Sequence, residues 1–339
     1  MMQIRSTLLH AWAILKTMSL RRICNAVRLV SSYLLSYYGA QFKLSGQPMA
    51  FAIEPTSMCN LKCPECPTGA NLLKRPRGFM DIQHYGKLLK QLSPELMYLN
   101  LYVQGEPLMH PQFANMVVQA SKLKLFTSTS TNGHYMTPTL AQQLVEGGLT
   151  RLIFSVDGTS QESYGLYRVG GSFHKVKQAM IDIARAKQRA RSAYPIVVMQ
   201  FIVFQHNEHE LPYVQKLANS LKVDKLEIKT AQLNAFGKMR PPLNVKYSRY
   251  SDELGKVLKS TPNNRCWRQW HSATATWDGR FSPCCYDKDA LHSFGNTNEQ
   301  TVPQIWHGSK SINFKKQIFK NSAEHEMCRN CTDGQKLFN

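Results

Sequence analysis

Acidic side chains are scarce in this chain of 339 residues, which has 22 Asp and Glu against 42 Lys and Arg and a formal charge of +20. Such an excess suggests an acidic partner, and an anionic lipid surface, a nucleic acid or an acidic peptide would each supply one. Because the basic residues are spread along the chain, a solvated basic surface is the alternative. The charge does not choose among these.

Several common motifs are also missing. The chain has no G-x-x-x-x-G-K-[ST] phosphate loop, no G-x-G-x-x-G fingerprint, no G-x-S-x-G elbow and no H-E-x-x-H pair among its eleven histidines. A charge-free run over 29–41 is shorter than the roughly 20 residues of a membrane span, and Lys16 interrupts any signal-peptide core. The sequence therefore predicts no transmembrane segment.

The first 48 residues predict amphipathic helices, because apolar residues recur there at spacings of three and four. These residues are Leu8, Leu9, Trp12 and Leu15, followed by Val27, Val30, Leu34 and Tyr38. Helices packed beside a barrel are the commoner outcome for such a segment. Peripheral contact with an anionic membrane is the alternative.

Six β-rich runs alternate with helical stretches after residue 48, which predicts an α/β fold with a parallel sheet. The runs cover 50–55, 97–103, 125–131, 151–156, 196–204 and 225–231. Such units wind into a barrel or partial barrel, whose active site forms at the C-terminal ends of the strands.

The division that we expect is an N-terminal helical segment, a core, a linker or helix, and a small C-terminal domain. Tryptophans, glycines and cysteines replace the strand and helix rhythm near the end of the chain. The predicted boundaries are 1–48, 49–240, 241–261 and 262–339.

Seven of the nine cysteines sit at metal-like spacings, which favours a reducing compartment and a cytoplasmic location over a disulfide framework. Cys59, Cys63 and Cys66 directly follow the first predicted strand. Their spacing lets one short loop surround a metal centre, and three thiolates leave a cubane iron cluster one protein ligand short. A partial zinc site or structural thiols are the alternatives.

This C-x3-C-x2-C pattern resembles the signature of radical S-adenosylmethionine (radical SAM) enzymes. Gly105-Glu106-Pro107 after the second predicted strand is similar to the motif that this family uses against the methionine amino group. The resemblance implies a partial (β/α)6 TIM-like barrel and a [4Fe-4S] cluster that cleaves SAM to a 5'-deoxyadenosyl radical. It also implies a reductant of the flavodoxin or ferredoxin type.

Polar residues at the ends of the third and fourth predicted strands reach the same rim. By resemblance, Asn132, Ser155 and Asp157 lie near the SAM ribose or methionine, and Arg168 holds the SAM carboxylate. Ordinary turn chemistry and a surface arginine are the alternatives. One departure is Glu65, which stands where the family usually has an aromatic residue near adenine.

The C-terminal cysteines resemble the SPASM or shorter twitch extension of radical SAM enzymes, which holds an auxiliary [4Fe-4S] cluster. The expected ligands are Cys266, Cys284, Cys328 and Cys331, with Cys285 as an alternative to Cys284. A zinc site could use the same four thiolates.

The resemblance implies hydrogen abstraction from a peptide or protein side chain, as in a maturase-type oxidation or cross-link. An alcohol or amino-sugar dehydrogenase acting on a small molecule is the alternative within the family. Outside it, an iron-sulfur electron carrier and a zinc-dependent nucleic-acid-binding protein remain as weaker interpretations.

Overall fold

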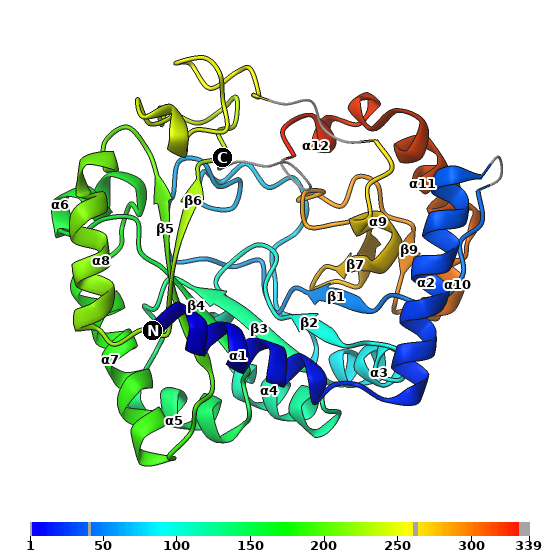
Figure 1. The fold of residues 1–339 in the computed structure, drawn as a ribbon, viewed down its shortest axis with the longest axis horizontal. Helices are drawn as coiled ribbons and strands as arrows, with labels where there is room; N and C mark the ends of the chain where they lie inside the picture. The colour runs from blue at the N-terminus through cyan, green and yellow to red at the C-terminus, as the bar shows by residue number, and fades with distance from the viewer. Residues whose placement is uncertain (1, 40–41, 260–263, 332–339) are drawn as a thin grey trace.

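The computed structural model describes residues 2–39, 42–259 and 264–331, and Figure 1 shows their arrangement. Its centre is one sheet whose strands run in the order β6-β5-β4-β3-β2-β1-β7-β8-β9. The six strands β1 to β6 pair in parallel and follow the order of the sequence. They curve into an open barrel with helices outside, so the expected α/β partial barrel is confirmed. These strands are Ala50–Ile53, Tyr98–Asn100, Phe126–Thr131, Arg151–Ser155, Ile196–Val203 and Lys225–Thr230.

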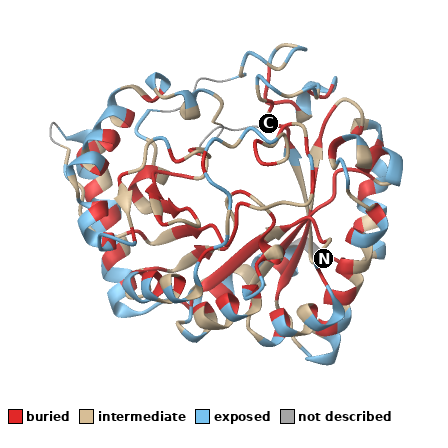
Figure 2. Cartoon of the chain, turned by 180° about the vertical axis from the view of Figure 1, so that it is seen from behind, coloured by how far each residue is buried: buried red, intermediate tan, exposed pale blue. Residues whose placement is uncertain are grey.

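Each crossover between these strands carries one or more helices, and their apolar faces pack on the sheet. Figure 2 shows the strands buried and the outer helix faces exposed. Short polar residues begin several of the helices by accepting a backbone N–H, as Thr137 does from Leu140 and Ser172 from Lys175. The helices are α3 Ile82–Leu92, α4 Phe113–Lys122, α5 Pro138–Glu146, α6 Gln161–Tyr167, α7 Phe173–Arg189 and α8 Leu211–Ser220.

The segment 241–261, for which a linker or a helix was expected, forms no α-helix in its described part. In the described part of 241–261 the only helical element is the single 3-10 turn Val245–Tyr247. The carboxylate of Asp252 accepts the N–H groups of Lys256 and Val257, and Gly255 has a φ of +70°. Such local side-chain bonds compete with a helix. The predicted boundary between 261 and 262 lies outside the described residues, and the domain division stays a prediction.

The C-terminal part continues the same sheet. Strand β7 (Ser272–Ala275) pairs in parallel with β1, and the short strands β8 (Arg280–Ser282) and β9 (Gly295–Asn296) follow antiparallel. Around them lie α9 Arg268–His271, α10 Val302–Trp306, α11 Ser309–Asn321 and α12 Glu326–Arg329. The barrel and the cysteine-rich end therefore share one scaffold.

The N-terminal segment forms two helices, α1 (Met2–Leu15) and α2 (Leu20–Tyr38). Helix α1 covers the N-terminal ends of the strands: His10 contacts Phe126 at the start of β3, and the Tyr194 hydroxyl donates to the Leu9 carbonyl at 2.9 Å. Helix α2 packs beside the C-terminal part, where Trp270 Nε1 donates to Ser32 Oγ at 2.9 Å. No helix in the described residues has the length and apolar character needed to cross a bilayer.

Candidate functional site

The cysteine loop leaves the C-terminal end of β1 and rests on the loop after β2. The Glu106 N–H donates to the Met58 carbonyl at 2.7 Å. Gly105 has a φ of +75°, and a Cβ there would lie 2.4 Å from the Thr56 carbonyl oxygen and 2.7 Å from that of Met58. Only glycine permits this approach. The first half of the Gly105-Glu106-Pro107 motif thus sets the distance between the two loops.

The Glu106 carboxylate is buried and held by the third strand. It accepts hydrogen bonds from Thr131 Oγ1 at 2.6 Å, from the Asn132 N–H at 2.7 Å and from the Leu108 N–H at 3.1 Å. Burial raises the pKa of Glu106, while these three bonds oppose the rise. Pro107 begins the 3-10 turn Pro107–Met109 behind it. The motif is therefore fixed before any ligand arrives.

Arg168 and Asp157 are paired with each other. Arg168 Nε donates to Asp157 Oδ2 at 2.6 Å, and Arg168 Nη1 lies 3.9 Å from Cys63 Sγ. The Ile202 N–H donates to Asp157 Oδ1 at 2.7 Å. Although burial opposes the charge of Arg168, Asp157 and Cys63 outweigh it and raise its pKa. The pair places a fixed positive charge beside the cysteine loop.

The other two rim residues lie at the predicted strand ends. Asn132 follows β3, and its Nδ2 donates to Asn60 Oδ1 in the cysteine loop at 2.9 Å. Ser155 is the buried last residue of β4. The structure thus brings Asn132 to the cysteine loop, alongside Glu106 and Arg168, while Ser155 stays at the end of its strand.

The three thiols of the cysteine loop influence one another. Burial raises the pKa of Cys59 to about 12, with smaller contributions from Glu106 and the two neighbouring thiols. Burial also raises the pKa of Cys63, against the effect of Arg168. Because thiolates are the metal ligands, deprotonation of Cys59 and Cys63 requires a strongly positive group nearby.

The C-terminal cysteines also gather, although they come from three separate segments. Burial raises the pKa of Cys328 to about 12, and Cys331 and Cys266 add to the shift. Burial raises the pKa of Cys284 well above its ordinary range, and Cys285 and Cys328 raise it further. All five thiols therefore lie close enough together to affect the pKa values of Cys284 or Cys328.

Both donor sets consist of thiols, the ligands that hold iron-sulfur clusters. Within 2–39, 42–259 and 264–331, no three His, Cys, Asp or Glu side chains converge to hold one metal ion. A zinc ion needs each sulfur about 2.3 Å from one point, whereas the thiolates of a [4Fe-4S] cluster bind different irons and stand further apart. The loop with three thiols fits a cluster with an open iron, and the C-terminal group fits a fully ligated one.

A cavity of about 700 Å³ lies beside Cys284 and Cys285, inside the barrel wall. Gln104 lines it and accepts from Cys66 Sγ at 3.8 Å. Cys284 and Cys285 also line it. Strands β1, β2 and β7 form its wall, and Ile14 of α1 also reaches it. A molecule in this cavity would touch Cys284 and Cys285, and it would reach Gln104, the hydrogen-bond partner of Cys66.

Glu65 has a structural role that sequence reasoning missed. Its carboxylate is buried and accepts the N–H groups of Asn234 and Met239 at 2.8 and 2.9 Å, which fastens the loop after β6 to the cysteine loop. Further along, Asn330 Nδ2 donates to the Leu233 carbonyl at 2.7 Å, between Cys328 and Cys331. This loop therefore connects the two cysteine segments.

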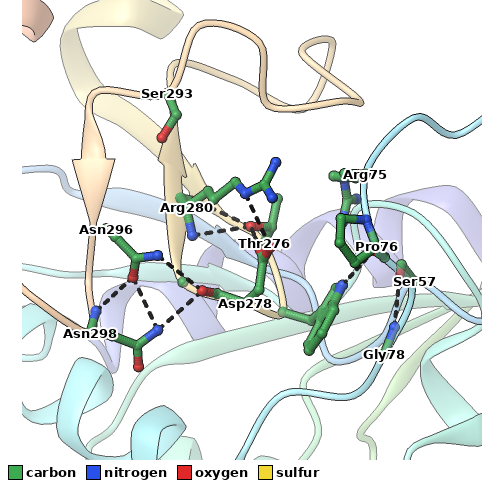
Figure 3. Close-up of polar contacts among 12 residues, drawn as sticks. Ser57, Arg75, Pro76, Gly78, Thr276, Asp278, Arg280, Ser293, Asn296 and Asn298 are labelled. Atoms are coloured by element: carbon green, nitrogen blue, oxygen red, sulfur yellow. Dashed lines mark hydrogen bonds and ion pairs between the residues drawn. The ribbon is translucent and has the colours of Figure 1, made fainter.

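A buried ion pair, which sequence reasoning also missed, connects the ends of three strands. Arg75 donates to both oxygens of Glu54, at 2.8 and 2.5 Å. The Gln104 and Trp277 N–H groups each donate to Glu54 at 3.2 Å. Figure 3 shows the neighbouring contact, in which Trp277 Nε1 donates to the Pro76 carbonyl at 3.1 Å. The sequence signal that could have revealed this ion pair is the position of Glu54, directly after strand β1.

Two family models match the chain. The model described as the radical SAM superfamily covers residues 53–216, and the model described as an iron-sulfur cluster-binding domain, SPASM, covers residues 266–332. The first includes the cysteine loop and the second includes all four expected auxiliary ligands. The two matches occur in the order and at the places where the geometry gathers thiols.

Curated relatives span most of the chain. A tungsten-containing aldehyde ferredoxin oxidoreductase cofactor-modifying protein of Pyrococcus furiosus is 26% identical over 83% of this chain and 86% of that protein. A PqqA peptide cyclase of Rhizobium meliloti is 24% identical over 84% of this chain and 79% of that protein.

A solved structure shares the fold. Streptococcus suis SuiB bound to S-adenosylmethionine superposes with a TM-score of 0.64 at 12% identity, over 86% of this chain and 73% of that one. The two matched domains imply a SAM-binding [4Fe-4S] cluster and an auxiliary cluster, which the donor sets above fit. The chain belongs to the radical SAM superfamily and carries a C-terminal iron-sulfur cluster-binding domain of the SPASM type.

Proposed function

We propose that this radical SAM enzyme modifies a peptide or protein side chain. In the proposal, Cys59, Cys63 and Cys66 bind the cluster that holds SAM. The auxiliary cluster is bound by Cys266, Cys284, Cys328 and Cys331. A cluster held by the first three thiolates would, when reduced, supply the electron for cleavage of SAM to a 5'-deoxyadenosyl radical, which abstracts a hydrogen from carbon.

The observation that carries the proposal is the cavity lined by Cys284, Cys285 and Gln104, the hydrogen-bond partner of Cys66. Gln104 connects its wall to Cys66, and Cys284 also lines it. A substrate held there would have Cys66 near one part of its surface and Cys284 near another. We infer a net oxidation or cross-link, because an auxiliary cluster held by Cys284 and its partners would be an electron acceptor beside the cavity.

In the proposal, the residues around the cysteine loop position SAM. We assign Arg168, held by Asp157, to the SAM carboxylate, because a fixed guanidinium binds a carboxylate through paired hydrogen bonds. We assign Glu106 and Asn132 to the methionine and ribose end, on their contacts with the cysteine loop.

The lining of the cavity favours a neutral or acidic substrate group. Arg268 and Lys288 line it, and its described lining residues include no Asp or Glu. Burial lowers the pKa of Lys288, while Cys66 and Cys285 oppose that shift. Lys288 therefore lies between the two cysteine segments, where a substrate carboxylate would meet a positive charge.

The relatives support the substrate class. One is named a peptide cyclase, which favours a peptide, whereas the other is named a cofactor-modifying protein, which favours the alternative of a small molecule. A flavodoxin-type or ferredoxin-type protein would supply the electron, and the excess of positive charge on this chain suits such acidic carriers.

Iron content and SAM cleavage test the proposal. The chain is purified without oxygen, reduced with dithionite and assayed for 5'-deoxyadenosine. We expect about eight irons per chain and SAM cleavage that Cys63→Ala abolishes and Cys24→Ala leaves unchanged. Iron without SAM cleavage after cluster reconstitution would contradict it. Deuterium transfer from labelled candidate peptides into 5'-deoxyadenosine then separates a peptide substrate from a small molecule.

A further inference from the structure

The two N-terminal helices present their apolar residues to the outside. Of the large apolar side chains that are exposed in the described residues, half lie between residues 4 and 38. On α1 they recur at helical spacing along one face, and on α2 they form a second stripe. They are Ile4, Leu8, Trp12 and Leu15, then Leu20, Ile23, Val27, Val30, Leu34, Leu35 and Tyr38, with Met18 between the helices.

The opposite face of α2 is buried and, apart from Leu29, polar, so hydrogen bonds fix the orientation of the helix. Arg22 donates to the backbone carbonyls of Thr17, Ser93, Leu123 and Lys124 at 2.7 to 3.3 Å. Because rotation of the helix would leave this guanidinium without those partners, the apolar stripe is held outward.

Two further polar contacts hold the buried face of α2. Asn25 Nδ2 donates to the Gln47 carbonyl at 2.9 Å and Asn25 Oδ1 accepts from the Gln47 N–H at 2.7 Å. Ser36 Oγ accepts from the Lys43 N–H at 2.9 Å. A helix that buries Arg, Asn and Ser while exposing Leu, Ile and Val needs an apolar environment on its outer side.

The charge of this segment selects the kind of environment. Residues 1–48 contain six Lys and Arg and no Asp or Glu. Arg21 is paired with Glu95, while Arg5, Lys16 and Arg28 are exposed. The Lys16 ammonium lies 5.5 Å from the Trp12 ring centre, which joins an aromatic and a cation at the edge of the apolar face. Apolar residues flanked by cations and Trp suit an anionic lipid surface.

We propose that α1 and α2 bind in the headgroup region of an anionic lipid bilayer. Each helix lies along the surface, since neither is built to cross it. The apolar stripe of α2 is about 28 Å long at 1.5 Å per residue. Figure 1 shows α1 in front of the strands and α2 in front of α10, so both helices lie on the near side of the molecule.

The position of α1 determines which end of the barrel would face the membrane. Helix α1 covers the N-terminal ends of the strands, where His10 contacts Phe126. The cysteine loop lies at the opposite, C-terminal ends. A membrane under α1 therefore leaves the cysteine loop facing the water, where a peptide and a protein reductant approach.

Vesicle sedimentation of the full, cluster-loaded chain tests the proposal. The vesicles contain either phosphatidylcholine alone or phosphatidylcholine with about one-third phosphatidylglycerol. We expect strong binding to the anionic vesicles only, and weaker binding as salt screens the charges. Lys16→Ala and Arg28→Ala should each weaken binding about fivefold.

The apolar contribution has a matched control. Val27→Ser with Leu34→Ser should weaken binding at least tenfold, whereas Leu243→Ser with Leu254→Ser, at equally exposed positions of the linker, should not. SAM cleavage in solution verifies that each variant is folded. Trp12 fluorescence should shift to the blue on binding, and Trp12→Phe should remove the shift.

Three results would overturn the proposal. The first is equal binding of wild type and the Val27→Ser, Leu34→Ser variant to anionic vesicles, and the second is no binding by wild type. The third is a dimer by size-exclusion chromatography that this variant converts to a monomer while vesicles bind neither form, because a second copy would then cover the helices.

Discussion

Asp157 holds Arg168 against the cysteine loop: Arg168 Nε donates to the Asp157 carboxylate at 2.6 Å, and Nη1 of the same guanidinium lies 3.9 Å from Cys63 Sγ. The two residues are eleven positions apart in the sequence and meet because β4 ends before one and α6 ends before the other. One carboxylate thus fixes the positive charge nearest to the expected cluster.

Replacing this carboxylate should impair the reaction more than assembly of the cluster. In Asp157→Asn the guanidinium loses its charged partner, so we expect SAM cleavage to fall tenfold or more with iron content unchanged. Arg151→Gln is the control, because its ion pair with Glu227 lies at the other end of the sheet. A parallel loss of iron would show that the pair supports the loop rather than SAM.

Gly105→Ala should disrupt the cysteine loop. The added Cβ meets two backbone oxygens of that loop at a positive φ, and we expect a cost of about 3 kcal/mol in unfolding free energy. Iron content should fall as well. In the control Gly165→Ala, within α6, the new Cβ has 3.5 Å to its nearest neighbour, and we expect about 0.5 to 1 kcal/mol of stabilisation by chemical denaturation.

Cys284 and Cys285 should differ as ligands. Cys284 is buried, is influenced by Cys328 and accepts a hydrogen bond from the Tyr286 N–H. We therefore expect Cys284→Ser to retain about four irons per chain and Cys285→Ser to retain about eight. Iron analysis with EPR of the reduced protein checks this. The reverse outcome would assign the ligand to Cys285.

Lys315 should make the free energy of unfolding depend on pH below the ordinary pKa of lysine. The side chain is fully buried, its ammonium lies 3.5 Å from the centre of the Trp306 ring, and burial lowers its pKa well below the ordinary lysine value. The unfolded chain then binds the extra proton between the folded and unfolded pKa values, so unfolding free energy rises with pH across that window.

Lys315→Met removes this charge from the core. We expect the variant to gain ~1–2 kcal/mol at neutral pH and to lose the alkaline rise. Urea denaturation at several pH values measures both effects. Lys316→Met on the exposed side of α11 is the control, and an alkaline rise that survives Lys315→Met would assign it to another group.

The sequence predicted the parts that depend on periodicity and local spacing. The six strands lie within one to three residues of their predicted bounds, and the cysteine loop follows β1 as expected. The pairing of Asp157 with Arg168 was not predicted. The sequence pattern suggested a separate contact with SAM for each residue, and nothing in it indicated that the two side chains contact each other. Glu65 was likewise read as a missing aromatic, while its partners lie about 170 residues away.

Helical periodicity also left one choice open. The pattern in residues 1–48 predicted amphipathic helices, and α1 and α2 confirm them. It could not tell which face packs inward, because the apolar face is usually the buried one. Four backbone carbonyls around Arg22 decide the orientation of α2, and they come from segments up to about 100 residues away.

The pairing of β7 with β1 has a consequence for biosynthesis. Ala50 pairs with Ser272, which is synthesised roughly 220 residues later. At 5–20 residues per second, the ribosome takes on the order of ten to forty seconds to reach it. Throughout that time the first strand has an open edge, the feature that invites wrong pairing. The nascent chain therefore exposes one edge of β1 until Ser272–Ala275 have been synthesised, and only then can the sheet close between the two cysteine-bearing parts.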